Sequence, residues 1–424
     1  GFEIDTSSYD HDDSSYGLKV DSGYHFLDAS AEFDDTKGYL TLTKNTSAVA
    51  DKAATANEQA VGGATEELGS GHEVHDAFIS TPSSQSVRAA YNGLTGEVHA
   101  STTSNAINAA LVSAGVISDR MRGAQLGGVT SAVTAFHGEG APQSGSLGAP
   151  QLWLRGYGSV LSVEESGSAA ETDTATGGIM AGFDTLFNEA ARIGVALGYS
   201  RTFSNTSDRF SKSRIDGFHG FAYGSSHFGA TSIRGGLGAT YNQIEASRET
   251  GLSGLPGILS ADYTGWTGQA WLEAAHLFPA GHSSYLEPFA GLSLVSSYTE
   301  SFTETGNAAA LNVEATRQTN LYSTFGIRLG TDIDISEAHT LGVSGSLGWR
   351  HAFGDVTPES TMSYASGSSS FNIAGLPLER DTLVFDAGID MPVSDSSLFD
   401  LRYSGQLGAN AQEHSFKGTF RLTF

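Results

Sequence analysis

The chain has 424 residues, with 53 Gly, 9 Pro and no Cys, and only 16% of its residues carry a charge. Its formal net charge of −25 argues against nucleic-acid binding, because a phosphate-binding face needs clustered Lys and Arg. No stretch approaches the roughly 20 apolar residues of a membrane-spanning helix. A chain this polar is an integral membrane protein only as a β-barrel, whose strands need an apolar residue at every second position.

The first 148 residues divide into regions of different composition. Residues 1–50 are acidic and contain strand-like pieces at 16–20 and 38–43. Residues 51–122 are rich in Ala, with Pro only at Pro82, which predicts helical structure with a partly helical junction over 51–103. Residues 123–148 are rich in Gly, Ser and Ala and are interpreted as a linker.

The strongest helical periodicity runs from 104 to 122. At 1.5 Å per residue this helix would reach about 28 Å, close to the thickness of a bilayer core. Ser104 is a candidate N-cap. The alternative is an ordinary surface or core helix. The residues that recur at helical spacing are Ala106, Ile107, Ala110, Leu111, Ala114, Ile117 and Met121.

From about residue 149 to the end the pattern changes to period 2. In the last segment Phe416, Gly418, Phe420, Leu422 and Phe424 alternate with Lys417, Thr419, Arg421 and Thr423. One face of each segment is apolar or small, and the other carries Gly, Ser, Thr and charges. This alternation is typical of strands that face lipid on one side and a polar lumen on the other.

Division at turn residues gives about twelve such segments, joined alternately by short and long connections. Short connections include 188–191 and 394–397, and long ones include 165–177 and 355–368. A soluble β-sandwich is the alternative, but many segments exceed its usual strand length of about 5–6 residues. The segment centres are near Leu154, Ala181, Val195, Gly217, Gly235, Trp271, Leu292, Ile327, Ser344, Phe385, Leu401 and Phe420.

Several ordered motifs resemble a known family. The C-terminal residues Gly418, Phe420, Leu422 and Phe424 resemble the assembly signal that ends bacterial outer-membrane proteins. The stretches 285–295, 348–355, 371–378, 383–390 and 401–406 resemble the autotransporter β-domain of type V secretion, and 55–61 and 94–101 resemble its junction region. The resemblance covers roughly residues 55–424.

This resemblance implies an all-β fold: a 12-stranded antiparallel barrel over residues 149–424 in the outer membrane of a Gram-negative bacterium. It implies an α-helix in the lumen, placed at 104–122, and a remnant of a β-helical passenger at 1–50. The implied function is to anchor the passenger and help export it to the cell surface. The implied partners are outer-membrane lipid, the barrel-assembly machinery, periplasmic chaperones and the chain's own passenger, and the chain is expected to be a monomer.

The polar faces of the segments place charges in the predicted lumen. We expect these charges to form an ion-pair network around the helix and its Asp119, Arg120 and Arg122; the alternative is simple solvation of the wall. The predicted lumen charges are Arg155, Arg192, Arg234, Glu273, Arg328, Asp332, Arg350, Asp386, Asp390, Asp400 and Arg402.

No motif predicts an enzyme, a cofactor or a metal centre. His72 and His75 have the wrong spacing for the H-E-x-x-H motif, and the acidic run at Asp10, Asp12 and Asp13 is interpreted as a solvated loop. Asn105 and Asn108 are not adjacent, so they lack the Asn-Asn pair at which some autotransporters cut themselves. The alternative functions are an outer-membrane porin or small transporter, and a surface adhesin with its activity in the N-terminal segment.

Overall fold

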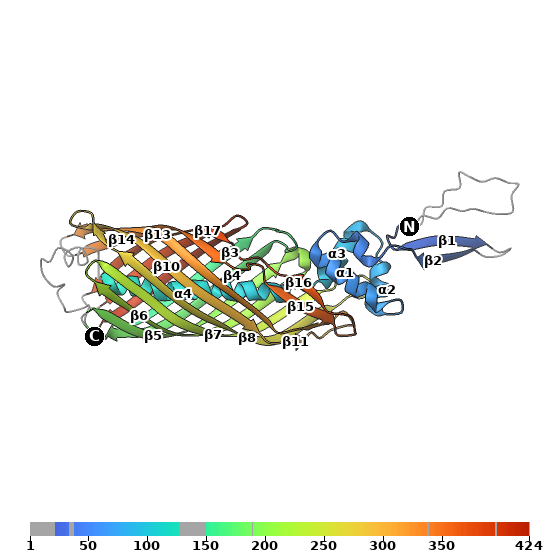
Figure 1. The fold of residues 1–424 in the computed structure, drawn as a ribbon, viewed down its shortest axis with the longest axis horizontal. Helices are drawn as coiled ribbons and strands as arrows, with labels where there is room; N and C mark the ends of the chain where they lie inside the picture. The colour runs from blue at the N-terminus through green and yellow to red at the C-terminus, as the bar shows by residue number, and fades with distance from the viewer. Residues whose placement is uncertain are drawn as a thin grey trace.

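Twelve strands close into one antiparallel barrel in the computed structural model, which describes residues 22–33, 38–126, 150–188, 190–336, 339–394 and 397–423 (Figure 1). The predicted fold class is confirmed, and each predicted segment centre lies within a barrel strand. The strands are β3 (Gln151–Val163), β4 (Thr172–Leu186), β5 (Ala191–Thr206), β6 (Ser211–Phe228), β7 (Thr231–Glu249), β8 (Ile258–His276), β10 (Ser284–Thr299), β13 (Thr316–Ser336), β14 (His339–Phe353), β17 (Asp381–Ser394), β18 (Ser397–Leu407) and β19 (Ala411–Thr423).

The ring closes where the last strand pairs with the first. The β19–β3 ladder runs from Ala411 opposite Val163 to Thr423 opposite Gln151. A short strand, β9 (Phe278–Pro279), pairs only with β10 beside the barrel. The backbone groups of the barrel strands are thus paired around the whole circumference, as a membrane-spanning sheet requires.

Side chains alternate between the two surfaces of the barrel wall. On β19, Lys417 and Thr419 are buried inside, whereas Phe416 and Phe420 are exposed outside. Leu197 and Leu237, in the middle of their strands, expose 74% and 65% of their surface on the outer face. The outer face is therefore a lipid-facing apolar belt, and the inner face is polar.

The longest connections of the barrel lie at one end, and most connections at the other end are short. Residues 229–230 join β6 to β7 and residues 337–338 lie between β13 and β14, whereas residues 300–315 separate β10 from β13 and residues 354–380 separate β14 from β17. The C-terminus lies at the short-turn end (Figure 1). By the usual arrangement of such barrels, short turns face the periplasm and long loops face the outside.

Within residues 22–33 and 38–126, four α-helices and one short 3-10 helix precede the barrel. They are η1 (Val49–Lys52), α1 (Ala56–Leu68), α2 (Glu73–Ile79), α3 (Ser84–Leu94) and α4 (Glu97–Leu126). Thr55 caps α1 by accepting from the amide of Glu58, and Ser83 caps α3 by accepting from Ser86. Pro82 separates α2 from α3, because proline lacks the amide that a continuous helix needs. None of the described helices is both long and apolar enough to cross a membrane.

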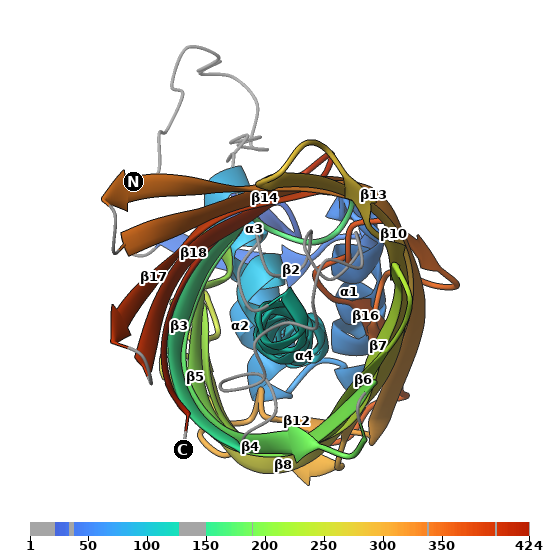
Figure 2. The same cartoon turned by 90° about the vertical axis from the view of Figure 1, so that its left-hand side faces the viewer.

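Helix α4 runs along the inside of the barrel (Figure 2). It begins and ends beyond the predicted range of 104–122, so that range was too narrow. Ser104 is not its N-cap: the Ser104 hydroxyl lies inside the helix and donates to the carbonyl of Leu376 at 2.5 Å. The polar run 101–104 concealed the first turns because it interrupts the apolar pattern. Residues 127–149, which hold most of the predicted linker, lie outside the described residues.

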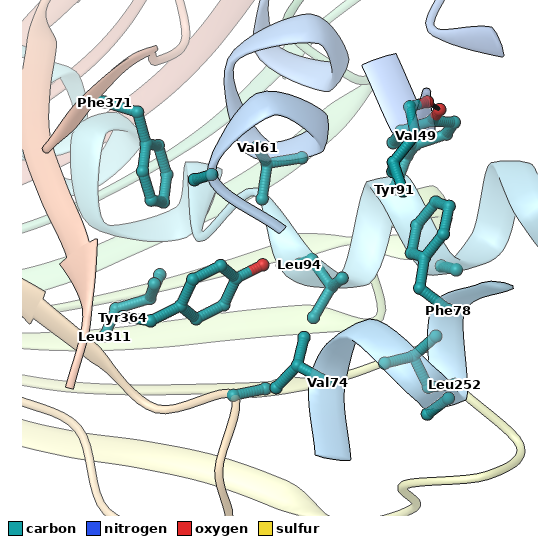
Figure 3. Packing of buried hydrophobic residues seen from close by; sticks show 14 of the residues in the cluster. Val49, Val61, Val74, Phe78, Tyr91, Leu94, Leu252, Leu311, Tyr364 and Phe371 are labelled. Carbon is teal, nitrogen blue, oxygen red and sulfur yellow. Dashed lines mark hydrogen bonds between the residues drawn. The ribbon is translucent and has the colours of Figure 1, made fainter. Parts of the chain in front are cut away.

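Helices α1–α3 pack on the long loops and form what we call the cap. Its loop part contains β11 (Phe302–Thr303), β12 (Leu311–Val313), β15 (Glu359–Tyr364) and β16 (Phe371–Ala374), which form a four-stranded sheet. Figure 3 shows Phe78, Tyr91 and Leu94 from the helices gathered with Tyr364 and Phe371 from the loops. One apolar core therefore joins the N-terminal helices to the barrel mouth.

A two-stranded hairpin, β1 (Leu27–Phe33) and β2 (Gly38–Lys44), extends from the cap (Figure 1). Strand β2 covers the predicted piece at 38–43, and β1 was not predicted. The other predicted piece, at 16–20, and the acidic run at Asp10, Asp12 and Asp13 lie outside the described residues.

Candidate functional site: the helix-filled lumen

Helix α4 contacts the lumen wall through apolar side chains along its length. Val98 and Ala106 pack with Ile215 and Tyr263, nearer the long-loop end. Ile107 and Ala110 pack with Val295, Tyr322 and Ala352, and Val116 and Met121 pack with Trp153 and Phe221 nearer the short-turn end. Of the seven predicted helix residues, six are buried and Leu111 is half-buried: Ala106, Ile107, Ala110, Ala114, Ile117 and Met121 are the buried ones.

Near its C-terminal end, α4 makes a buried ion pair with strand β4. Arg120 donates from Nε and Nη2 to the two carboxylate oxygens of Asp184, at 2.8 and 2.7 Å. Arg192 of β5 also pairs with Asp184 at 2.6 Å, and the Tyr223 hydroxyl donates to it at 2.9 Å. The Asp184 and Arg120 side chains are both fully buried. Such a pair is stable only with good geometry and satisfied hydrogen bonds, and three donors serve this carboxylate.

A second ion-pair cluster joins α4 to the strands that close the barrel. Asp119 lies 2.9 Å from Nζ of Lys417 on β19 and 3.4 Å from Nη1 of Arg155 on β3. Arg122, one turn further along the helix, also pairs with Asp119. Arg155 reaches Asp400 of β18 at 2.7 Å. Four segments of the chain therefore meet at this cluster.

The opposite side of the wall carries an ion-pair network of its own. Arg234 of β7 pairs with Glu273 of β8 at 3.0 Å and with Glu287 of β10 at 2.8 Å. Arg328 of β13 pairs with the same two carboxylates, at 2.5 and 2.8 Å. The Arg328 guanidinium also lies 3.7 Å from the ring centre of Phe289. This network links neighbouring strands to one another.

The remaining predicted lumen charges also face the interior. Asp386 pairs with Arg402 at 2.5 Å, and Arg350 donates to the side chain of Gln406 at 2.9 Å. Asp332 and Asp390 are half-buried and both approach Gly342 of β14. A cavity of about 210 Å³ remains beside α4 and is lined by Glu273, Arg328, Arg350 and Asp386 among others. Its polar lining is suited to water, so the interior is filled but not dry.

The N-terminal end of α4 is held where the helix meets the cap. Glu97 pairs with Arg209 of the β5–β6 loop at 2.7 Å. Arg248 donates from Nε and Nη2 to the two carboxylate oxygens of Glu304, in the β10–β13 loop, at 2.8 and 2.7 Å. Oε1 of Glu304 also lies 2.7 Å from Nε2 of His99. Burial would raise the pKa of Glu304, but the charge of Arg248 and the His99 hydrogen bond hold it well below its ordinary value of 4.5.

Several of these residues were not predicted from the sequence. Asp184 and Glu287 lie on the same faces as predicted lumen charges, so extending the alternation of β4 and β10 to each strand end would have found them. Lys417 was assigned to the polar face but not to the lumen charges. Glu304 and Arg209 belong to loops, where no periodicity reveals which way a side chain points.

The predicted C-terminal assembly residues lie on the outer face of β19. Phe420 is exposed, and Gly418 and Leu422 are half-buried on the same face. Phe424 lies outside the described residues. Across the described ranges, no group of three or more His, Asp or Glu side chains is arranged to hold a metal ion.

Comparisons with known proteins agree with this architecture. The family model described as autotransporter beta-domain matches residues 152–404. An extracellular serine protease of Serratia marcescens is 28% identical over 345 residues, which are 81% of this chain and 32% of that protein. Outer membrane protein B of Rickettsia japonica is 26% identical over 198 residues, covering 45% of this chain and 12% of that protein. The chain therefore spans about a third of the length of the Serratia relative.

Solved structures of two autotransporter domains illustrate the shared fold. The translocator domain of the autotransporter NalP from Neisseria meningitidis matches with a TM-score of 0.56 at 14% identity, over 75% of this chain and 98% of that one. The β-domain of the Bordetella autotransporter BrkA matches with a TM-score of 0.50 at 17% identity, over 65% of this chain and all of that one, 100%. At these identities the likeness concerns the fold alone.

Proposed function

Because the chain belongs to the autotransporter β-domain family, we propose that it anchors an N-terminal passenger in the outer membrane and helps export it to the cell surface. The barrel is an outer-membrane translocator. The observation that carries the proposal is the path of α4. The segment that precedes the barrel passes through its lumen (Figure 2). Glu97 pairs with Arg209 at the long-loop end, and Gly123 accepts from Arg421 near the end of β19, at the short-turn end. A chain on this path emerges outside the cell with the cap and everything N-terminal to it.

The test is surface display of a reporter. A small tagged domain fused before residue 22 should be labelled by antibody on intact Gram-negative cells and removed by external protease. The matched control lacks residues 411–424, so that β3 loses its seam partner β19 and the barrel cannot close. A reporter that becomes accessible only after lysis, with the barrel correctly inserted, would contradict the proposal.

We further propose that the barrel-assembly machinery, supplied by periplasmic chaperones, inserts this barrel and recognises the outer face of β19. The support is that Phe420 and Leu422 present an apolar row on the last strand. Replacing Phe420 with Ser should slow the appearance of heat-resistant barrel in the membrane. The matched change Leu401→Ser, on the outer face of β18, should slow it less.

A porin or small transporter is the second candidate. The cluster of Asp119, Lys417 and Arg155 ties α4 to the wall, which argues against a freely open lumen. In planar bilayers we expect the whole chain to show low conductance and a chain without residues 22–126 to show much higher conductance. A large, steady conductance with α4 present would favour the porin.

We propose that the passenger's own activity belongs to residues N-terminal to the cap. That activity is either proteolytic, as the name of the Serratia relatives suggests, or adhesive. We assign no catalytic role to the barrel. We also propose that the passenger stays covalently attached, because Asn105 and Asn108 do not form an adjacent pair. Outer membranes should then give one uncut band on an SDS gel.

A further inference from the structure

The β3–β19 seam differs from every other strand pairing in the barrel. The two strands occupy Gln151–Val163 and Ala411–Thr423, at opposite ends of the barrel sequence. The entropy lost on closing a loop grows with the length of the loop, so this pairing is the hardest for the chain to form.

The lumen side of the seam carries buried cations on both strands. Arg155 stands on β3 directly opposite Thr419, and Lys417 stands two residues before Thr419 on β19. Both side chains are buried, where solvent screens charges poorly. Two buried like charges on neighbouring strands oppose the approach of the two strands.

A carboxylate from α4 lies between these cations. Oδ2 of Asp119 is 2.9 Å from Lys417 Nζ and 3.4 Å from Arg155 Nη1. In the described part of the chain, Asp119 is the one carboxylate that pairs with Lys417. One turn later Arg421 of β19 donates to the carbonyl of Gly123 at 3.3 Å, so α4 meets the last strand twice.

We propose that α4 secures the barrel seam, with Asp119 as the positioning residue that turns repulsion between Arg155 and Lys417 into attraction. The inference rests on the proposed function. While a passenger segment still occupies the lumen, Asp119 is not at the seam, and β3 is held to β19 by the backbone ladder and the Arg155–Thr419 hydrogen bond without the helix. Arrival of α4 at its final register would then complete closure, so that the finished barrel is tightest when export has ended.

The alternative is that Asp119 stabilises the barrel as any buried ion would. Engineered disulfides distinguish the two, because the chain has no Cys of its own. Leu154→Cys with Phe420→Cys would join paired residues across the seam on the outer face. Leu237→Cys with Ala270→Cys would join β7 to β8 in the same way, away from the seam. The readout is the temperature at which the purified whole chain loses its folded mobility in SDS.

Asp119→Asn should lower this temperature by about 5–10 °C, because it removes the carboxylate that pairs with Lys417 and leaves Arg155 with Asp400 alone. The seam disulfide should restore most of the loss, and the β7–β8 disulfide should not. Glu273→Gln is the matched control, since Glu273 bridges Arg234 and Arg328 within the wall. The drop in this temperature caused by Glu273→Gln should not be reversed by the seam disulfide.

No loss in Asp119→Asn, or equal rescue by both disulfides, would overturn the proposal. If Asp119→Asn does not assemble, the double variant Asp119→Asn with Lys417→Met decides. We expect the double variant to assemble even without the seam disulfide, because one opposing cation is gone; continued failure to assemble would contradict the proposal. These measurements report barrel stability and need no exported reporter. Their outcome can therefore be distinguished from a failure of the translocator proposal.

Discussion

The stability of the barrel depends on single residues that form fully buried ion pairs in the lumen. Asp184 is the clearest case, because Arg120, Arg192 and Tyr223 all donate to it and its side chain has no exposed surface. Asp184→Asn should lower the free energy of unfolding by about 3–5 kcal/mol, since it leaves two guanidinium groups without a full counter-charge. Unfolding of the detergent-solubilised barrel in guanidinium chloride measures this.

The control for Asp184 is a surface pair of the same chemistry. Glu245 pairs with Arg214 on the outer wall, where its side chain is 51% exposed. Glu245→Gln should change stability by less than about 1 kcal/mol. Equal effects of the two substitutions would show that burial does not govern the lumen pairs.

Glu304 makes the stability of the cap depend on pH. Its folded-state pKa lies below the ordinary value of 4.5, so its contribution is complete above that value and is lost as pH falls through the folded-state pKa. The stability difference between the wild type and Glu304→Gln should therefore be constant near neutral pH and shrink as the pH falls below about 4. Thermal unfolding of the cap by circular dichroism across this range measures it.

The control is Glu300→Gln, an exposed carboxylate near the same rim that accepts from Thr264 at 2.7 Å. Its substitution should have little effect, because an exposed hydrogen bond exchanges readily with water. A stability difference for Glu304→Gln that grew on acidification would contradict the direction of the pKa shift.

Sequence alternation placed many inward charges but could not pair them. It put Arg155, Glu273 and Arg328 on the polar face, where the structure has them. The partner of each depends on strand register and on the height of α4 in the lumen, and neither leaves a local pattern. The pairing of Asp119 with Lys417 joins residues 298 positions apart.

At the scale of elements, Gly96 connects the cap to the lumen helix. Its φ of +66° lies in the left-handed region, and a Cβ there would lie 2.5 Å from Cδ1 of Leu311 and 3.1 Å from Sδ of Met362. Gly96→Ala should destabilise the cap by about 1–3 kcal/mol. Faster proteolysis between residues 49 and 94, with unchanged heat resistance of the barrel, is the expected result.

Replacing Gly63 with Ala should have the opposite effect on the stability of the cap. It lies within α1, and a Cβ there would meet nothing within 4 Å. Gly63→Ala should stabilise the helix by about 0.5–1 kcal/mol, because Ala loses less conformational freedom than Gly. Slower proteolysis in Gly63→Ala than in Gly96→Ala would locate the effect in the backbone conformation.

Strands were easier to predict from this sequence than the cap. A barrel strand has one face in lipid and one in the lumen, so the period-2 pattern survives over its whole length. The cap has no such constraint. Its core combines Val61 and Phe78 with Tyr364 and Phe371, which lie about 300 residues later in the chain. The loop strands β11, β12, β15 and β16 are short, and their pairing is set by the cap rather than by local sequence.

For the whole molecule, stability requires that the apolar outer belt of the barrel lies in the hydrocarbon layer of the membrane. Leu237 is 65% exposed on the outer face of β7, between Ile233 and Tyr241. Leu237→Arg would place a charge near the middle of the hydrocarbon layer, at a cost of about 2–4 kcal/mol. Gln243 lies on the same face, two residues beyond Tyr241 toward the long loops, and Gln243→Arg should cost roughly 0–1 kcal/mol.

This comparison tests the membrane orientation of the entire barrel. Refolding into vesicles at several urea concentrations gives the stability of each variant. The depth dependence should vanish in a soluble protein, because an exposed Arg there meets water at either position. Equal stabilities of Leu237→Arg and Gln243→Arg would therefore contradict the conclusion that the outer belt faces lipid. The polar lumen, the helix inside it and the export of a passenger all depend on that belt.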